Sequence, residues 1–133
     1  LRINLSLFDS QVDGIPGPHN RLDRQPRGSL NLGADYRYPG SAWSFGANWG
    51  YTPEIVIQQT EILRLRTSKR VVLDAYAQYT QNSALSWRLG LSNLAPRDAL
   101  ESSLIDTGSG LVSQTETLNP SYLSWTLRAE LRF

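Results

Sequence analysis

The sequence predicts an all-β fold of about six antiparallel strands, and two observations support this. Apolar and polar residues alternate with a period of two in several segments, which sends successive side chains of a strand to opposite faces of a sheet. Residues that favour turns separate these segments. A helical membrane span would require about 20 consecutive, mostly apolar residues, and the sequence contains no such run.

The first three strands are predicted at residues 1–8, 29–38 and 43–51. In each of them alternate residues are apolar, and the residues between them are mostly small or polar. Pro39-Gly40-Ser41 predicts a tight turn between the second and third strands. Pro53 is expected to end the third strand, because proline removes a donor from the hydrogen-bond ladder.

The last three strands are predicted at residues 71–80, 85–92 and 122–133. Leu63 and Leu65 are expected to extend the apolar face of the first of these backwards. A second tight turn is predicted at Gln81-Asn82-Ser83, and the segment that ends on Phe133 alternates most regularly of all. Three longer stretches remain as connections: residues 9–28, 53–70 and 96–119.

Short and long connections alternate strictly along the chain, which is typical of transmembrane barrels with short periplasmic turns and long extracellular loops. Glycine recurs on the polar faces, as expected for a sheet with a crowded concave side. We therefore expect the strands to form an arc of an outer-membrane β-barrel with its C-terminus on the periplasmic side. The apolar faces carry aromatic residues expected in the girdles at the two membrane interfaces: Tyr36, Tyr38, Trp43, Trp49, Tyr51 and Tyr79.

Alternation alone is equally typical of a soluble antiparallel β-sandwich, in which the apolar residues point inward. A sandwich that acts as a binding or adhesion module therefore remains an alternative. Solubility distinguishes the two, because an apolar outer face with open strand edges is expected to aggregate without detergent.

In the barrel interpretation the polar faces line the lumen, since a charge on the lipid face would cost about 2–4 kcal/mol at the membrane midplane. A structural ladder of charges that keeps the wall polar is the favoured explanation for them, with contact to a bound solute as the alternative. The residues concerned are Asp35, Arg37, Asp74, Arg88, Arg128, Glu130 and Arg132.

Composition argues against several classes of site. The net charge is +1, without the concentrated basic patch that nucleic acid requires. Cysteine is absent and His19 is the only histidine, so no metal site, cofactor or enzyme centre is predicted. Asp9, Asp13 and Asp23 match no calcium-loop spacing and are interpreted as turn formers. Basic residues of the long connections, expected to be solvated or to meet anionic solutes or lipopolysaccharide phosphates, are Arg21, Arg24, Arg27, Arg64, Arg66, Lys69 and Arg70.

Several segments together resemble the late barrel of TonB-dependent outer-membrane receptors, and the resemblance spans nearly the whole chain. In order, they are the stretch from Ile15 to Pro26 followed by residues 29–37, Leu-Asp-Ala-Tyr at 73–76, Leu-Ser-Asn-Leu at 91–94, and the closing strand that ends in Phe133. The resemblance implies a larger parent with a plug domain, a TonB box and a barrel of about 22 strands. Residues 1–133 would be its C-terminal portion. Leu1 already belongs to a predicted strand and no signal peptide precedes it, so the plug and the earlier strands are expected to be absent here.

The resemblance further implies import of a scarce nutrient (siderophore-bound iron, cobalamin or a carbohydrate) across the outer membrane of a Gram-negative bacterium. The implied partners are outer-membrane lipid and lipopolysaccharide, the plug and the rest of the barrel, TonB through the missing N-terminal part, and the barrel assembly machinery. A small porin-like barrel is the alternative within the membrane class. The assembly machinery is expected to recognise the closing strand through Trp125, Leu127, Ala129, Leu131 and Phe133.

Overall fold

The computed structural model describes residues 1–15, 17–108 and 111–132. Ten strands form two antiparallel sheets in this part of the chain, so the predicted all-β class is confirmed. No helix of the described residues has the length and apolar character needed to span a membrane. The strands are β1 (Arg2–Leu7), β2 (Gly28–Arg37), β3 (Trp43–Thr52), β4 (Ile55–Gln58), β5 (Leu63–Thr67), β6 (Arg70–Thr80), β7 (Leu85–Ser92), β8 (Ala99–Asp106), β9 (Leu111–Asn119) and β10 (Ser124–Leu131).

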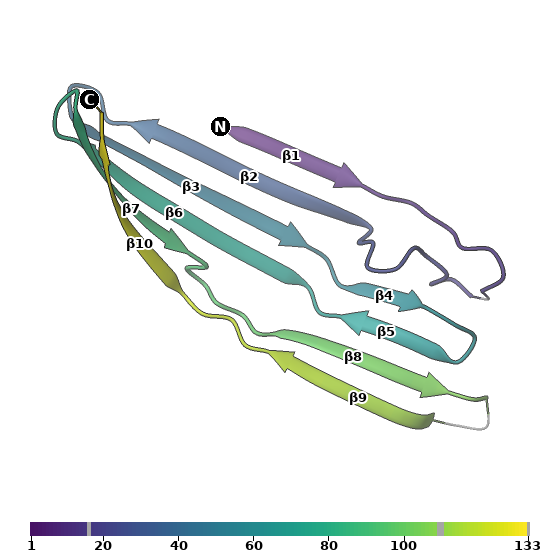
Figure 1. Cartoon of the computed structure of the whole chain (residues 1–133). Helices are drawn as coiled ribbons and strands as arrows, with labels where there is room; N and C mark the ends of the chain where they lie inside the picture. The colour runs from purple at the N-terminus through teal and green to yellow at the C-terminus, as the bar shows by residue number, and fades with distance from the viewer. Residues whose placement is uncertain (16, 109–110, 133) are drawn as a thin grey trace.

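The larger sheet has six strands in the order β1-β2-β3-β6-β7-β10, and all neighbouring pairs are antiparallel (Figure 1). The residue range of each strand agrees closely with one of the predicted segments, although β10 is shorter than the segment 122–133 predicted for it. In the described residues β1 pairs only with β2, and β10 pairs only with β7. The antiparallel arrangement is thus as predicted, and the sheet is open at both edges in this part of the chain.

The smaller sheet corrects two predictions. Residues 53–70 and 96–119 were expected to be loops, but they contain the hairpins β4-β5 and β8-β9, which pair in the order β4-β5-β8-β9. Leu63 and Leu65 belong to β5 of this sheet and do not extend the apolar face of β6. Two of these strands are hard to predict from the sequence. β4 has only four residues, and β8 lacks a regular alternation of apolar and polar residues.

Short turns and long connections lie at opposite ends of the larger sheet (Figure 1). Gly40, in the turn between β2 and β3, has a φ of +72°, which glycine adopts without steric cost. In the turn between β6 and β7, the Oδ1 atom of Asn82 accepts the N–H groups of Ala84 at 2.9 Å and Leu85 at 2.8 Å. Both predicted tight turns are therefore confirmed. The other end carries the connection 9–28 and the smaller sheet.

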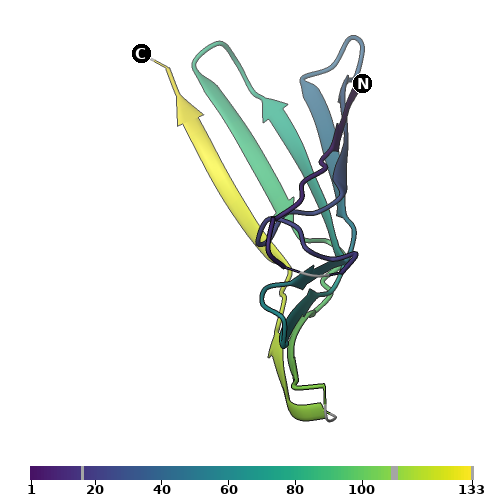
Figure 2. The same cartoon turned by 90° about the vertical axis from the view of Figure 1, so that its right-hand side faces the viewer.

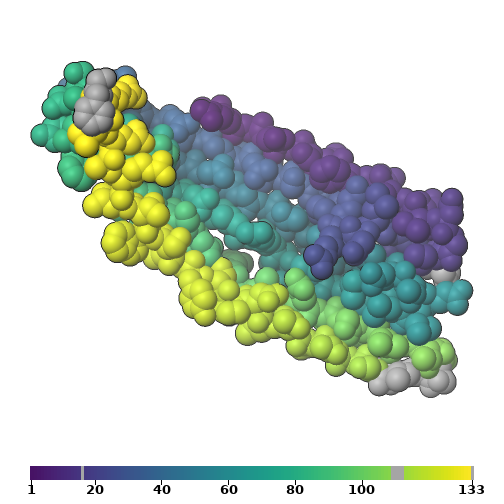
Figure 3. All heavy atoms as spheres, viewed as in Figure 1, coloured from purple at the N-terminus to yellow at the C-terminus, as the bar shows by residue number. Residues whose placement is uncertain are grey.

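The larger sheet is a single curved layer (Figure 2). Its strands lie side by side in the space-filling view, and no second sheet covers them on the face shown (Figure 3). Ile57 is the only buried hydrophobic residue of the described part of the chain, with 3% of its surface exposed. A cavity of about 800 Å³ is lined by residues from all six strands on the polar side of the larger sheet, which makes the polar face the concave one.

Asn93, just after β7, ties together the strands around the end of the larger sheet. Its backbone has a φ of +58°, and its N–H group donates to Asp74 Oδ1 on β6 at 2.9 Å. Its side-chain Nδ2 donates to Ser121 Oγ and to the carbonyl oxygen of Tyr122, which precede β10. A single residue therefore joins β6, β7 and the approach to β10.

Two substitutions separate the contributions of Asn93 to stability. Asn93→Gly keeps the left-handed backbone accessible and removes the side-chain hydrogen bonds, so we expect it to lower the free energy of unfolding by about 1 kcal/mol. Asn93→Val removes the same bonds and also strains the backbone, so we expect a further loss of about 1–2 kcal/mol. Denaturant titration followed by tryptophan fluorescence measures both variants. Equal stability of the valine and glycine variants would contradict the contribution of the backbone.

Candidate functional site

One row of residues crosses five strands on the polar face of the larger sheet. Residues that oppose each other directly in antiparallel strands lie on the same face. The row therefore runs across the cavity, and all of its members line it. From β2 to β10 they are Asp35, Gly46, Tyr76, Gly90 and Thr126.

Gly46 makes room for the ring of Tyr76 to lie across β3. A Cβ atom at position 46 would lie 2.2 Å from Tyr76 Cε1 and 2.8 Å from Asp35 Oδ1, which is closer than real Cβ contacts allow. With glycine at this position, the Tyr76 hydroxyl donates a hydrogen bond to Asp35 Oδ1 at 2.7 Å. The contact between β6 and β2 therefore depends on a glycine in the strand between them.

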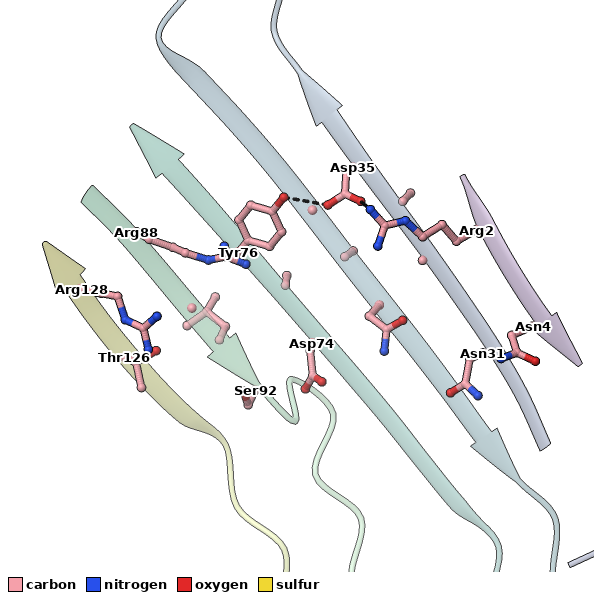
Figure 4. Close-up of a pocket in the computed structure, with 18 of the residues that line it drawn as sticks. Arg2, Asn4, Asn31, Asp35, Asp74, Tyr76, Arg88, Ser92, Thr126 and Arg128 are labelled. Carbon is pink, nitrogen blue, oxygen red and sulfur yellow. Dashed lines mark hydrogen bonds and ion pairs between the residues drawn. The ribbon is translucent and has the colours of Figure 1, made fainter. Parts of the chain in front are cut away.

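Two arginines extend this contact in both directions, as Figure 4 shows. Arg2 of β1 lies 3.4 Å from Asp35 Oδ2, with the two side chains 85% and 50% exposed. Such an exposed ion pair contributes about 1 kcal/mol at most. Arg88 of β7 places its guanidinium carbon 3.8 Å from the centre of the Tyr76 ring, in a cation–π contact. A continuous chain of contacts thus runs from β1 to β7.

The residues predicted to face the lumen are divided between the cavity and its surroundings. Arg37 and Glu130 lie outside the cavity lining, and Glu130 is 3.9 Å from Arg128. Arg132 lies beyond the end of β10, where its backbone N–H donates to the carbonyl oxygen of Ala84 at 2.8 Å. The members that line the cavity are Asp35, Asp74, Arg88 and Arg128.

Arg2 and Tyr76 belong to this site but are not singled out by the sequence. The alternation places both on the polar face, yet nothing local distinguishes them from their polar neighbours. The distinguishing signal for Tyr76 is Gly46, whose missing side chain matters only once the register sets it between Tyr76 and Asp35.

Two of the short motifs that carry the family resemblance lie against each other. Asp74, from the sequence at 73–76, accepts the N–H group of Asn93, from the sequence at 91–94. The N–H group of Leu94 donates to the carbonyl oxygen of Leu73 at 2.7 Å. One oxygen of the Asp74 carboxylate is therefore occupied by the connection that follows β7.

The aromatic residues predicted for the membrane interfaces form two groups on the apolar face. Near the short turns, the ring centres of Trp43 and Tyr79 are 5.0 Å apart, and Trp87 continues their row on β7. Towards the other end of β3, Trp49 and Tyr51 stack with ring centres 6.0 Å apart. Further ring contacts near the short turns involve Tyr36, Tyr38 and Phe45.

β10 exposes most of the residues predicted as an assembly signal. Trp125, Leu127 and Leu131 are large exposed apolar side chains, and Ala129 of the same strand is exposed as well. Phe133, the last residue of the predicted signal, lies outside the described residues.

Several basic residues of the long connections are engaged within the chain. Arg66 forms an ion pair with Glu54, and a hydrogen bond to that carboxylate raises the pKa of the Arg66 guanidinium above its usual value. Arg21 donates to the carbonyl oxygen of Phe8 at 2.6 Å. Arg64 donates through Nε to a side-chain oxygen on β4 at 3.2 Å. These contacts leave fewer guanidinium donors free for anionic partners.

His19 contributes to the fold through its backbone. Its carbonyl oxygen accepts the N–H groups of Arg21 at 2.9 Å and Gln58 at 2.8 Å, which holds the connection 9–28 against β4. Across residues 1–15, 17–108 and 111–132 there is no group of three or more His, Cys, Asp or Glu side chains that could hold a metal ion.

Comparisons of the chain with protein-family models, with curated proteins and with solved structures found no match. The candidate site is therefore defined by the geometry of the concave face alone. The face presents guanidinium, carboxylate, hydroxyl and amide groups around one cavity, an arrangement that suits the binding of a polar or charged ligand.

Gly46→Ala is expected to push the Tyr76 ring away from Asp35, because the added Cβ overlaps the ring. Overpacking of this kind costs about 1–3 kcal/mol of unfolding free energy. Tyr76→Phe is the matched control, since it keeps the ring and loses only the hydrogen bond, at a cost of about 1 kcal/mol. Denaturant titration should rank Gly46→Ala as the less stable variant. A Gly46→Ala variant as stable as the wild type would mean that the ring does not cross β3.

Proposed function

We propose that this chain is the C-terminal part of the β-barrel of a TonB-dependent outer-membrane receptor, which imports a scarce nutrient of the siderophore-iron, cobalamin or carbohydrate class. The observation that carries the proposal is the two-sided character of the larger sheet. One face exposes apolar and aromatic side chains without a covering layer in the described residues, and the concave face carries charged groups around a cavity. Lipid outside and a polar lumen inside account for both faces.

The spacing of the aromatic groups supports a membrane environment. Trp43 and Tyr51 lie at opposite ends of β3, eight residues apart, which corresponds to about 26 Å along a strand. A strand tilt of about 40° reduces this to about 20 Å along the membrane normal, comparable to the apolar band of about 25 Å between the aromatic girdles of such barrels.

A soluble β-sandwich accounts less well for the same observations. Two packed sheets bury the side chains of their inner faces in a shared core about 10 Å thick. In the described part of the chain, Ile57 is the only buried hydrophobic residue. An apolar face that exposes large side chains on five of the six strands of the sheet is a site of lipid contact or aggregation in water.

The partners follow from the edges and ends of the sheet. The free edges of β1 and β10 call for strands from the rest of the barrel. The short turns lie on the periplasmic side in this proposal, and the smaller sheet with the connection 9–28 faces the cell surface and lipopolysaccharide. The plug covers the concave face and transmits the action of TonB. The barrel assembly machinery recognises β10 by strand addition to its free edge.

Two neighbouring substitutions on β3 test the lipid-facing side in the full-length protein. Ala47→Arg places a charge in the middle of the apolar face, where it costs about 2–4 kcal/mol in lipid, so the amount of folded, heat-modifiable protein in outer membranes should fall strongly. Asn48→Arg places the same charge on the polar face and should leave that amount nearly unchanged. Equal levels of the two variants would contradict a lipid-facing apolar side.

Uptake measurements separate a TonB-dependent receptor from a porin-like barrel. Accumulation of labelled siderophore iron, cobalamin or oligosaccharide should fall to background when the gene is deleted, and to the same level when TonB is removed. The physical reason is that a plugged lumen does not conduct without energy from the inner membrane. Uptake that persists without TonB, but requires this gene, favours the porin-like alternative.

A further inference from the structure

Two arginines oppose each other directly on the concave face. Arg88 of β7 and Arg128 of β10 are register partners, so both side chains leave the sheet on the same side and start about 5 Å apart. Like charges in this position destabilise a sheet. Both residues also line the cavity. A pair of this kind is favourable when an anion lies between the guanidinium groups.

Neither guanidinium is satisfied within the described chain. Arg88 lies over the Tyr76 ring and donates no hydrogen bond to any described residue. Arg128 is 3.9 Å from Glu130, with the two side chains 73% and 43% exposed, and it likewise donates no hydrogen bond within the described chain. An exposed pair at this distance contributes little. The planar donor groups of both arginines are therefore available to a ligand.

The two carboxylates that line the cavity are engaged elsewhere. Asp35 accepts the hydrogen bond of Tyr76 and pairs with Arg2. Asp74 accepts the N–H group of Asn93. The positive charge around Arg88 and Arg128 is consequently not neutralised by the cavity's own acidic groups.

The sheet also leaves space beside the two arginines. Gly90 lies opposite Thr126, and a Cβ atom at position 90 would approach Thr126 Oγ1 to 2.9 Å. The absence of a side chain at Gly90 therefore leaves space in the cavity next to the Thr126 hydroxyl group. In Figure 4, Arg88 is directed towards Tyr76 and Arg128 towards Thr126. Because Tyr76 and Thr126 are the register partners of Gly90 on its two sides, the guanidinium groups flank the glycine.

We propose that Arg88 and Arg128, with the hydroxyl group of Thr126, form a binding site for an oxyanion, a carboxylate or phosphate group of a small solute held over Gly90. Guanidinium groups bind both anions through paired, charge-assisted hydrogen bonds. Because import is the proposed function, the solute would be an anionic nutrient on its path through the lumen, and to that extent the site rests on that proposal.

Calorimetric titration of the full-length protein in detergent at low ionic strength tests the site, with citrate and inorganic phosphate as separate probes. We expect at least one probe to bind, and the double variant Arg88→Gln/Arg128→Gln to weaken that binding by about tenfold or more. The probe that binds identifies the oxyanion class. If neither probe binds the wild type, the site does not exist.

Matched variants control for charge and for folding. Arg37→Gln removes one positive charge from the same face but lies outside the cavity lining, and it should leave the affinity within about twofold of the wild type because screened charges at a distance contribute little. An equal loss in this variant would overturn the site in favour of general electrostatic attraction. Arg88→Lys/Arg128→Lys keeps the charge and the fold but removes the paired hydrogen bonds, and it should also weaken binding. Unchanged affinity in the lysine variant would overturn the proposed geometry.

Failure of the site and failure of the proposed function give different results. Protein that reaches the outer membrane and supports TonB-dependent uptake, but binds neither probe, refutes the site alone. Protein that is absent from the outer membrane, but binds a probe and loses it in the double glutamine variant, supports the site and refutes the receptor assignment.

Discussion

Backbone hydrogen bonding between neighbouring strands is the constraint on which this structure depends. Ile57 is the only buried hydrophobic residue of the described chain, so side-chain packing in a dry core cannot hold the sheets together. The longest contribution comes from β3 and β6, which are paired from Trp43 opposite Tyr79 to Thr52 opposite Arg70. Every strand of the larger sheet is held by backbone pairing of this kind, which does not use the side chains on either face. The two faces can therefore contact two different environments.

The same ladder decides which side chains meet on the concave face. A shift of one residue between two strands would move every side chain of one strand to the other face. In the observed register Gly46 separates Asp35 from Tyr76, and the tyrosine hydroxyl bridges the gap. The same rule sets Arg88 opposite Arg128. The contact chain and the arginine pair are both consequences of register, one of them stabilising and the other electrostatically unfavourable without a ligand.

The apolar face and the concave face support one interpretation together. In the proposed barrel, the aromatic rings at both ends of β3 suit the interfaces of a membrane, and an unbalanced pair of arginines suits a water-filled lumen that an anion can enter. Asn93 ties the larger sheet together at the end that carries the long connections, because it joins β6, β7 and the approach to β10. Asp74, which accepts the N–H group of Asn93, also lines the cavity.

The sequence by itself determined the strands of the larger sheet, their two faces and their tight turns, because alternation and turn chemistry are local properties. Local patterns are weak in β4 and β8, and the smaller sheet was accordingly missed. Leu63 and Leu65 alternate with polar residues as expected for a strand, but that strand belongs to the smaller sheet. Alternation does not identify the partner strand. Only the tertiary structure decided pairing and register, which depend on hydrogen bonds between residues far apart in the chain. For that reason the sequence placed Tyr76 on a face, and the structure alone placed it over Gly46 against Asp35.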